Sequence, residues 1–221
     1  MAATPPEFTG FPPQAFDFYV ALDGNNTKAW WSDHKSDYER FVRGPIEALM
    51  SELADEFGEA KVFRPYRDTR FSKDKTPFKD HQGAVVHIED GIGYYVQVSA
   101  HGLMTAGGWY SSGGEQIAHY RDAVEGPRGP ELQKMITALS KKFEFDGRAL
   151  KTRPRGYDID HPRIDLLRNR AVLMSRTYDI EPWVSTRKAL TVVRKDWQSL
   201  RPLMEWLADN VGPVEDPALG E

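Results

Sequence analysis

Hydrophobic spacing at the start of the chain predicts a short helix. Phe16, Tyr19 and Leu22 recur three residues apart behind a pair of prolines. Proline is tolerated in a first helical turn, where its missing N–H has no helical partner. The polar run at residues 23–26 ends the pattern. We therefore expect one short amphipathic helix before residue 23.

A second helical pattern extends from residue 38 to residue 57. Its apolar positions are Tyr38, Phe41, Val42, Ile46, Leu49, Met50, Leu53 and Phe57. Ser36 and Glu39 fit a capping box, so the helix is predicted to start at Ser36. Because proline breaks the helical ladder, Gly44-Pro45 predicts a kink or a fresh start within this helix.

From Lys61 onward the apolar period changes to two, which predicts extended chain. Residues 63–71 carry charge on both faces, and Pro65 within them indicates an edge strand or a bulge. Residues 83–88, 93–100 and 103–110 read as three strands joined by glycine turns. The economical arrangement of these strands is an antiparallel meander.

The last hundred residues predict shorter helices, one further strand and a long helix. The predicted helices are 115–124, 132–139, 162–167 and 190–211, and the predicted strand is 171–177. Pro162 is expected in the first turn of the third helix, and Pro202 is expected to interrupt the last. Helices at both ends of the chain around a central run of strands indicate the α+β class. We expect a single globular domain over residues 1–211, built on a central antiparallel sheet flanked by helices from both chain ends. A polar C-terminal tail, 212–221, follows it.

The composition excludes several classes of protein. The chain has 221 residues, 40% of them hydrophobic and 28% charged, and no cysteine. Disulfides, thiolate zinc sites, iron–sulfur clusters and a cysteine nucleophile are therefore absent. No apolar run reaches the roughly 18 residues of a membrane span, so no membrane partner is expected. The N-terminus lacks the basic and apolar regions of a secretory signal, which indicates a cytoplasmic protein.

Positive charge gathers in two separated segments of a chain whose net charge is −4. Residues 61–81 carry seven basic and three acidic side chains, a net of +4, and residues 148–176 carry eight and three, a net of +5. The arginine fork suits phosphate and carboxylate groups. We predict that folding brings both segments to one pocket for an anionic small molecule. The alternative is two solvated faces balanced by neighbouring acids.

Individual residues of these segments are the candidates for binding and catalysis. The predicted anion-binding residues are Arg64, Arg67, Arg70, Lys73, Lys75, Lys79, Arg153, Arg155 and Arg170. The predicted proton-transfer residues are His81, His161 and Asp68. Each has a structural alternative: a histidine often caps a helix or bonds within the core, and an acid between two arginines usually neutralises them.

The block RPYRDTRFSKDKTPFKDH, residues 64–81, resembles the signature of the family called domain of unknown function 2461. The resemblance covers nearly the whole chain, because four other segments occur along it in the same order as in that family: FTGFPPQAFDF and GNNTKAWW before the block, KTRPRGYDIDHP and IDLLRNR after it. The sequence departs from it at Val98-Ser99-Ala100, where many relatives have an acidic residue and proline. The resemblance implies no activity, cofactor or catalytic residue.

Other side chains offer weaker signals for chemistry. The histidines lack the spacing of a helical zinc site, so neither a metal nor a cofactor is expected. Trp30 and Trp31 have the chemistry to stack on a base or sugar. We favour a structural interpretation, with one tryptophan in the core and Asn25 and Asn26 in a turn and cap.

Three functions remain open on this sequence. The first is a protein that binds a phosphate- or carboxylate-bearing small molecule, as an enzyme or without catalysis. The second is a binding module for nucleic acid or an acidic protein partner, for which the acidity of the remaining chain, a net of −13, makes DNA the less favoured ligand. The third is an architectural role, in which the arginines form internal salt bridges. The oligomeric state and the reaction cannot be derived from these residues.

Overall fold

The computed structural model describes residues 7–70, 73–110 and 113–212. The chain forms two compact units, which we describe separately. The first unit comprises Met1–Val86, Tyr95–Thr105 and Thr177–Asp196. The second comprises His87–Tyr94, Ala106–Arg176 and Trp197–Glu221.

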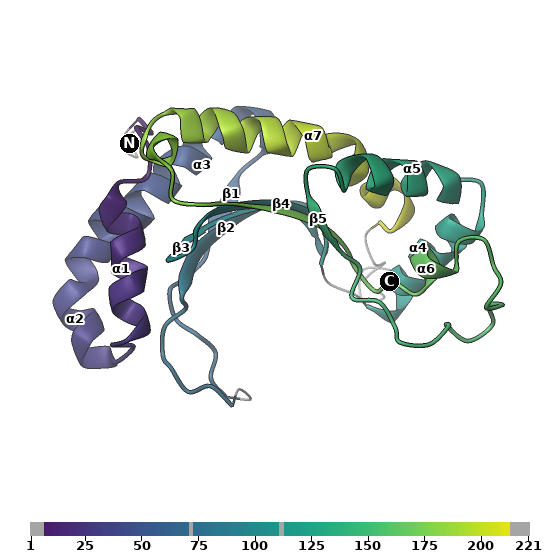
Figure 1. Cartoon of the computed structure of the whole chain (residues 1–221), viewed down its shortest axis with the longest axis horizontal. Helices are drawn as coiled ribbons and strands as arrows, with labels where there is room; N and C mark the ends of the chain where they lie inside the picture. The colour runs from purple at the N-terminus through teal and green to yellow at the C-terminus, as the bar shows by residue number, and fades with distance from the viewer. Residues whose placement is uncertain (1–6, 71–72, 111–112, 213–221) are drawn as a thin grey trace, which may run out of the picture. The chain divides into compact units, whose positions relative to one another are not determined.

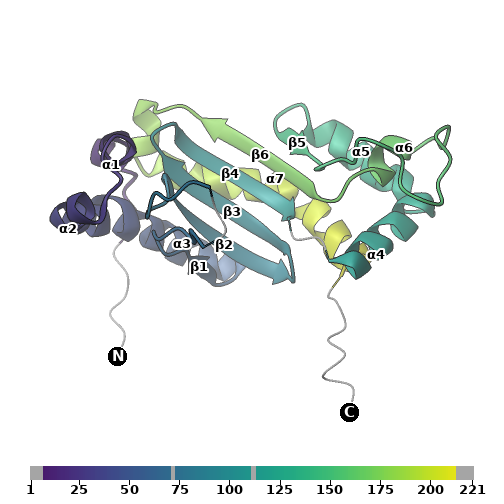
Figure 2. The same ribbon diagram turned by 90° about the horizontal axis from the view of Figure 1, so that it is seen from below.

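Six strands form one sheet in the order β1-β2-β3-β4-β6-β5 (Figure 2). They are β1 (Ala60–Val62), β2 (His81–Glu89), β3 (Ile92–Ser99), β4 (Gly102–Trp109), β5 (Glu144–Asp146) and β6 (Val172–Tyr178). Lys61 of β1 lies opposite Val85 of β2, and Phe145 of β5 lies opposite Met174 of β6, both in antiparallel register. The predicted α+β class and its antiparallel sheet are confirmed.

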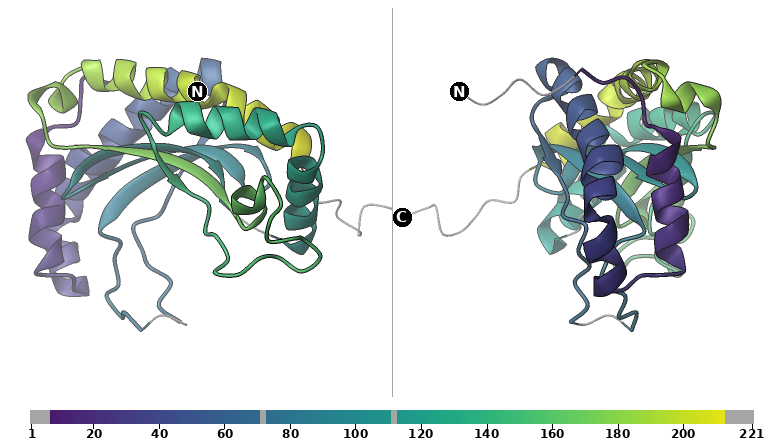
Figure 3. Two further views of the ribbon diagram at one scale, coloured as in Figure 1. Left: turned by 45° about the vertical axis from the view of Figure 1, so that its right-hand side comes forward. Right: turned by 90° about the vertical axis from the view of Figure 1, so that its left-hand side faces the viewer.

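Three helices precede the sheet in the first unit: α1 (Pro13–Asp23), α2 (Lys28–Asp37) and α3 (Gly44–Phe57). Figure 3 shows α1 and α2 side by side. The predicted start at Ser36 was wrong, because α2 begins after Thr27, whose hydroxyl accepts a hydrogen bond from the Trp30 N–H at 3.2 Å. Ser36 lies inside the helix. The backbone N–H groups that a capping serine would bind are satisfied there by carbonyls of the preceding turn.

Pro45 explains the change of helix type between α2 and α3. Residues Tyr38–Arg43 form a π-helical segment, η1, and α3 follows with Pro45 in its first turn. A proline removes one N–H donor and its ring crowds the carbonyl four residues earlier. The wider π turn accommodates both effects without ending the helical path. The kink predicted at Gly44-Pro45 therefore takes the form of a π segment.

The connection from β1 to β2 is a long loop that extends beyond both strands (Figure 1). Its two arms run antiparallel: the Arg67 N–H donates to the Pro77 carbonyl at 2.9 Å, and the Lys79 N–H donates to the Pro65 carbonyl at 2.8 Å. One isolated bridge joins Tyr66 and Phe78. The edge strand predicted over residues 63–71 is not formed: residues 63–70 pair as a loop ribbon and not as a strand of the sheet, and residue 71 lies outside the described residues.

In the second unit, α4 (Gly114–Glu125) contacts both α5 (Gly129–Leu139) and α6 (Ile164–Leu167) (Figure 1). The Tyr120 hydroxyl on α4 donates to the Leu166 carbonyl at 2.9 Å.

Strand β6 continues through the short 3-10 helix η2 (Pro182–Ser185) to α7 (Lys188–Asn210), which contains Pro202. The C-terminal helix predicted at 190–211 is confirmed, but the interruption predicted at Pro202 was wrong, because Pro202 lies inside one continuous helix.

Arg187 ties the N-terminal segment of the first unit to α3. Its guanidinium contacts both carboxylate oxygens of Glu52, at 2.9 and 2.5 Å, and the Phe8 carbonyl at 2.9 Å. Glu52 also accepts the Phe8 N–H at 2.7 Å. Desolvation raises the pKa of Glu52, but these hydrogen bonds and the Arg187 charge outweigh it and hold the pKa below its ordinary value of 4.5.

Replacing Glu52 with glutamine should lower the free energy of unfolding at pH 7 by about 1 kcal/mol, because the ion pair is half-exposed and screened. A carboxyl group whose pKa is lowered in the folded state stabilises the fold at pH values above its ordinary pKa, and this stabilisation is lost as the pH falls through the folded-state pKa. Between pH 7 and pH 3, urea unfolding should therefore show a smaller loss in the free energy of unfolding for the variant than for the wild type. Identical pH dependence in both proteins would contradict this assignment.

The predicted single domain over residues 1–211 stays a prediction. The predicted polar tail lies outside the described residues apart from Gly212. Among residues 7–70, 73–110 and 113–212, no helix is long and apolar enough to cross a membrane.

Candidate functional site

The long β1–β2 loop is anchored to the helices of the first unit through Phe78. The side-chain amide of Asn26 forms two hydrogen bonds with the Phe78 backbone, one to its carbonyl at 3.0 Å and one from its N–H at 3.1 Å. The Phe78 ring is 2% exposed and stacks on Trp31 with 4.0 Å between ring centroids. The structural interpretation of this tryptophan is confirmed. Asn26 binds the loop, whereas the cap of α2 is Thr27.

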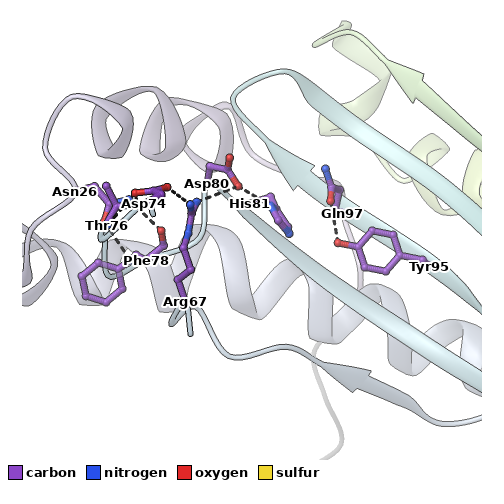
Figure 4. Close-up of polar contacts among 9 residues, drawn as sticks. All are labelled: Asn26, Arg67, Asp74, Thr76, Phe78, Asp80, His81, Tyr95 and Gln97. Carbon is purple, nitrogen blue, oxygen red and sulfur yellow. Dashed lines mark hydrogen bonds and ion pairs between the residues drawn. The ribbon is translucent and has the colours of Figure 1, made fainter. Parts of the chain in front are cut away.

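This anchor places three charged side chains side by side, as Figure 4 shows. The Arg67 guanidinium forms an ion pair with Asp74 and lies 3.9 Å from the Asp80 carboxylate. Asp74 accepts two further hydrogen bonds, from the N–H and the hydroxyl of Thr76, at 2.9 and 2.8 Å. The Thr76 N–H and hydroxyl, together with Arg67, lower the pKa of Asp74.

Asp80 also contacts the histidine next to it in sequence. Its Oδ1 atom lies 2.7 Å from His81 Nδ1 (Figure 4). Partial desolvation raises the pKa of Asp80, but the hydrogen bond and charge of His81, together with Arg67, outweigh it and lower the pKa below its ordinary value of 3.8. An ionised carboxylate can only accept, so His81 Nδ1 carries the hydrogen of this bond.

The Asp80–His81 pair lies where two pockets of the first unit adjoin. One pocket of about 290 Å³ is lined by Tyr19, Val20, Asp23, Asp80, His81, Gln97, Ser99, Ala100 and His101. The other, of about 170 Å³, is lined by Leu22, Asp23, Asn26, Arg67, Asp74, Thr76 and Asp80. Asp23 and Asp80 belong to both linings. We call these two pockets together the Asp80 site.

The walls of the larger pocket come from distant parts of the chain. Tyr19 and Asp23 lie on α1, His81 begins β2, and Gln97 lies on β3. Gln97 accepts a hydrogen bond from the Tyr95 hydroxyl at 2.8 Å. Desolvation and the Asp80 charge raise the pKa of Tyr95, which keeps its hydroxyl neutral. The lining of the larger pocket therefore offers carboxylates, imidazoles, an amide and one phenol within a small volume.

Carboxylates outnumber permanent cations in the lining of the Asp80 site. It contains Asp23, Asp74 and Asp80 against one guanidinium, Arg67. The carboxylates of Asp23 and Asp80 repel an anionic group that binds close to them. A ligand of the Asp80 site therefore binds best when it places hydrogen-bond donors or uncharged groups beside these carboxylates and any anionic group near Arg67.

A protein-family model for conserved hypothetical proteins, DUF2461, matches residues 14–206 of the chain. The chain belongs to the DUF2461 family. The resemblance noted in the sequence is thereby confirmed, and the match includes the whole described β1–β2 loop. Neither the comparison with curated proteins nor the comparison with solved structures found a match.

The basic side chains that this DUF2461 member carries in the β1–β2 loop have different surroundings. Arg70 pairs with Asp68 at 2.7 Å, and both are exposed. Lys75 donates to the Thr69 carbonyl at 2.8 Å. Lys79 lies 5.0 Å from the centre of the Phe63 ring, and desolvation lowers its pKa.

Arg64 and Lys73 of the same loop are exposed. Neither forms an ion pair or a side-chain hydrogen bond with another residue that the structure describes. Of the predicted cations, Arg67 is the one that lines the Asp80 site.

The second predicted segment belongs to the other unit. Arg153 donates to the Tyr157 carbonyl at 2.5 Å, and Arg155 and Arg170 are exposed. His161 Nδ1 accepts the Arg163 N–H at 3.1 Å, a local bond to the backbone just before α6. Whether these cations share a pocket with the first segment stays a prediction, as does catalysis by His161 or Asp68.

Sequence reasoning missed Tyr19 and Asp23, and it did not pair Asp80 with His81. The Asp-His dipeptide was a visible signal, since adjacent side chains at a strand start can meet. Asp23 offered no such signal, because it ends a helix nearly sixty residues earlier. Within the described ranges, no group of three or more histidine and acidic side chains has an arrangement that could hold a metal ion.

Proposed function

We propose that this DUF2461 protein is a cytoplasmic enzyme that binds a small molecule bearing a phosphate or carboxylate group and transfers a proton at His81. The observation that carries the proposal is the 2.7 Å contact between Asp80 and His81 in the lining of the larger pocket. A histidine oriented by a carboxylate is a recurring arrangement for general acid–base chemistry.

The direction of this hydrogen bond supports a basic role for His81. Because Nδ1 donates to Asp80, the neutral ring carries its lone pair on Nε2. Nε2 has no hydrogen-bond partner among residues 7–70, 73–110 and 113–212. Asp80 is ionised near neutral pH since its pKa is lowered. It can therefore stabilise the imidazolium that forms when Nε2 takes a proton from a ligand.

Cations of the β1–β2 loop are the proposed partners of the anionic group. Arg67 lines the smaller pocket, and its guanidinium has five N–H donors, more than its two carboxylate neighbours occupy. Arg64 and Lys73 add exposed positive charge on the same loop. The proposal that Arg153, Arg155 and Arg170 of the second unit join them rests on sequence charge alone.

A thermal-shift titration tests this proposal. Inorganic phosphate, nucleotides, sugar phosphates, 2-oxo acids and short oligonucleotides would be added separately to the protein. Saturable stabilisation by a small anion is expected, with a rise of about 2.7 kcal/mol in the free energy of unfolding at one hundred times the dissociation constant. The double variant Arg64→Ala with Lys73→Ala should weaken this response and remain folded.

Lys35→Ala is the control, because Lys35 is an exposed cation of α2 and lies outside the β1–β2 loop. Its response to small anions should equal that of the wild type. Equal weakening in the control and the double variant would mean that total charge, and not the loop, governs binding. No response of the wild type to any small anion would refute the proposed function.

A binding module without catalysis is the second candidate. Tyr66 is 57% exposed on the β1–β2 loop, where Arg64 and Arg70 are also exposed. An exposed aromatic ring beside arginines can stack on a nucleobase while the cations meet phosphates. Stabilisation by oligonucleotides alone, lost as salt is raised, would favour this candidate over the enzyme.

A further inference from the structure

Tyr19 is a buried phenol at the Asp80 site that the proposed function does not use. Its side chain is 2% exposed and lies on the buried face of α1. It nevertheless lines the larger pocket, together with Asp80 and His81. The Phe18 ring packs against it edge-on, with 5.4 Å between centroids, which holds the phenol in place.

The Tyr19 hydroxyl forms no hydrogen bond with any residue that the structure describes. Two other buried side-chain donors in these residues lack a partner, the indole nitrogens of Trp31 and Trp206, and both are sealed from solvent. The Tyr19 oxygen is not among the sealed atoms, so it retains contact with open space. Because the side chain is otherwise enclosed, that space is the pocket it lines.

Electrostatics keeps the hydrogen on this hydroxyl. Desolvation raises the pKa of Tyr19 well above its ordinary value of 10.0, and the charge of Asp80 raises it further. The phenol therefore remains neutral and offers its hydrogen. No described residue accepts this hydrogen, and the hydroxyl faces the pocket, so its acceptor is a molecule in that pocket: water, or the oxygen of a ligand that displaces the water.

We infer that Tyr19 donates a hydrogen bond to an uncharged oxygen, a carbonyl or hydroxyl, of the molecule that occupies the larger pocket. This inference rests on the proposed function and narrows its substrate class. Asp23 and Asp80 disfavour a charged oxygen at this place. The ligand accordingly has two distinct parts: an anionic group at the loop cations and an uncharged oxygen between Tyr19 and His81. Sugar phosphates and 2-oxo acids have this combination.

The closing experiment compares Tyr19→Phe with Tyr38→Phe, since both phenols are buried. The Tyr38 hydroxyl donates to Gln82 at 2.5 Å, whereas that of Tyr19 has no partner among the described residues. In the unliganded protein, Tyr38→Phe should lower the melting temperature by about 3–8 °C. Tyr19→Phe should leave it unchanged or raise it. A fall in Tyr19→Phe as large as that in Tyr38→Phe would overturn the inference and leave the proposed function intact.

The binding arm uses inorganic phosphate, dihydroxyacetone phosphate, glucose 6-phosphate and pyruvate. In the wild type, at least one of the last three should bind more tightly than inorganic phosphate. Tyr19→Phe should weaken that compound about 5-fold to 100-fold while phosphate binding stays unchanged. Equal affinities in the variant and the wild type would overturn the inference alone. Failure of every probe to bind the wild type would overturn the proposed function, and the inference with it.

Discussion

Replacing Phe78 with alanine should lower the free energy of unfolding by about 3–5 kcal/mol. The ring is 2% exposed and stacks on Trp31 at 4.0 Å, so its removal leaves a cavity between the loop and α2. The substitution should also reduce the order of the Asp80 site, because Asn26 and Phe78 hold the loop segment that carries Asp74 and Asp80. Urea unfolding measures the stability, and amide hydrogen exchange over residues 66–79 measures the order of the loop.

Tyr66→Ala is the control for this prediction. Tyr66 lies on the same loop and bridges to Phe78, but 57% of it is exposed. Its replacement by alanine should lower the free energy of unfolding by about 1 kcal/mol or less, because folding buries little apolar surface at that position. Similar losses in Tyr66→Ala and Phe78→Ala would show that Phe78 is not the anchor of the loop.

Replacing His81 with glutamine should reduce kcat by about 10²-fold to 10⁴-fold for the compound identified in the thermal-shift titration. Glutamine retains hydrogen bonding to Asp80 but cannot accept and return a proton. The dissociation constant of that compound should change little, since the loop cations are proposed to hold its anionic group. Measuring kcat and ligand affinity separately distinguishes this chemical role from a contribution to binding.

Two further variants complete the catalytic test. His87→Gln is the control, because His87 is exposed and contacts the Tyr110 hydroxyl in the second unit. It should leave kcat unchanged. Asp80→Asn should lower kcat, since asparagine does not stabilise an imidazolium. Because the pKa of Asp80 lies below 3.8, the wild type should lose the carboxylate's contribution only as the pH falls through that lower value. A full-rate His81→Gln enzyme would exclude His81 as the base.

Most regular elements could be predicted from the sequence, and the errors have physical causes. Strands β2, β3 and β4 were located because the turn residues Asp90-Gly91 and His101-Gly102 bound three apolar runs, although burial along these strands is nearly continuous and does not alternate. Strand β5 was missed, since three residues are too few to display a period, whereas Lys61 and Val62 of β1 fall within the predicted extended chain. The start of α2 was misplaced because Ser36 fits a cap in sequence, while Thr27 occupies the cap in space.

The candidate site was less accessible to sequence reasoning. The dense charge of residues 64–81 identified the β1–β2 loop as unusual, and Arg67 and His81 were among the residues singled out. Residue type alone did not reveal that Arg67 pairs with Asp74, or that Arg70 turns to Asp68. In an extended segment with charge on both faces, the alternation of side chains does not say which face meets the protein.

The sequence by itself determined the α+β class, the antiparallel strands and the loop that carries most of the candidate cations. These features depend on local periodicity, turn residues and composition, which act over a few positions of the chain. The tertiary structure alone decided that Tyr19 and Asp23 of α1 share a pocket with His81 and Gln97. It also decided that this pocket has an acidic lining. Such proximity depends on packing between segments far apart in sequence, and no local pattern encodes it.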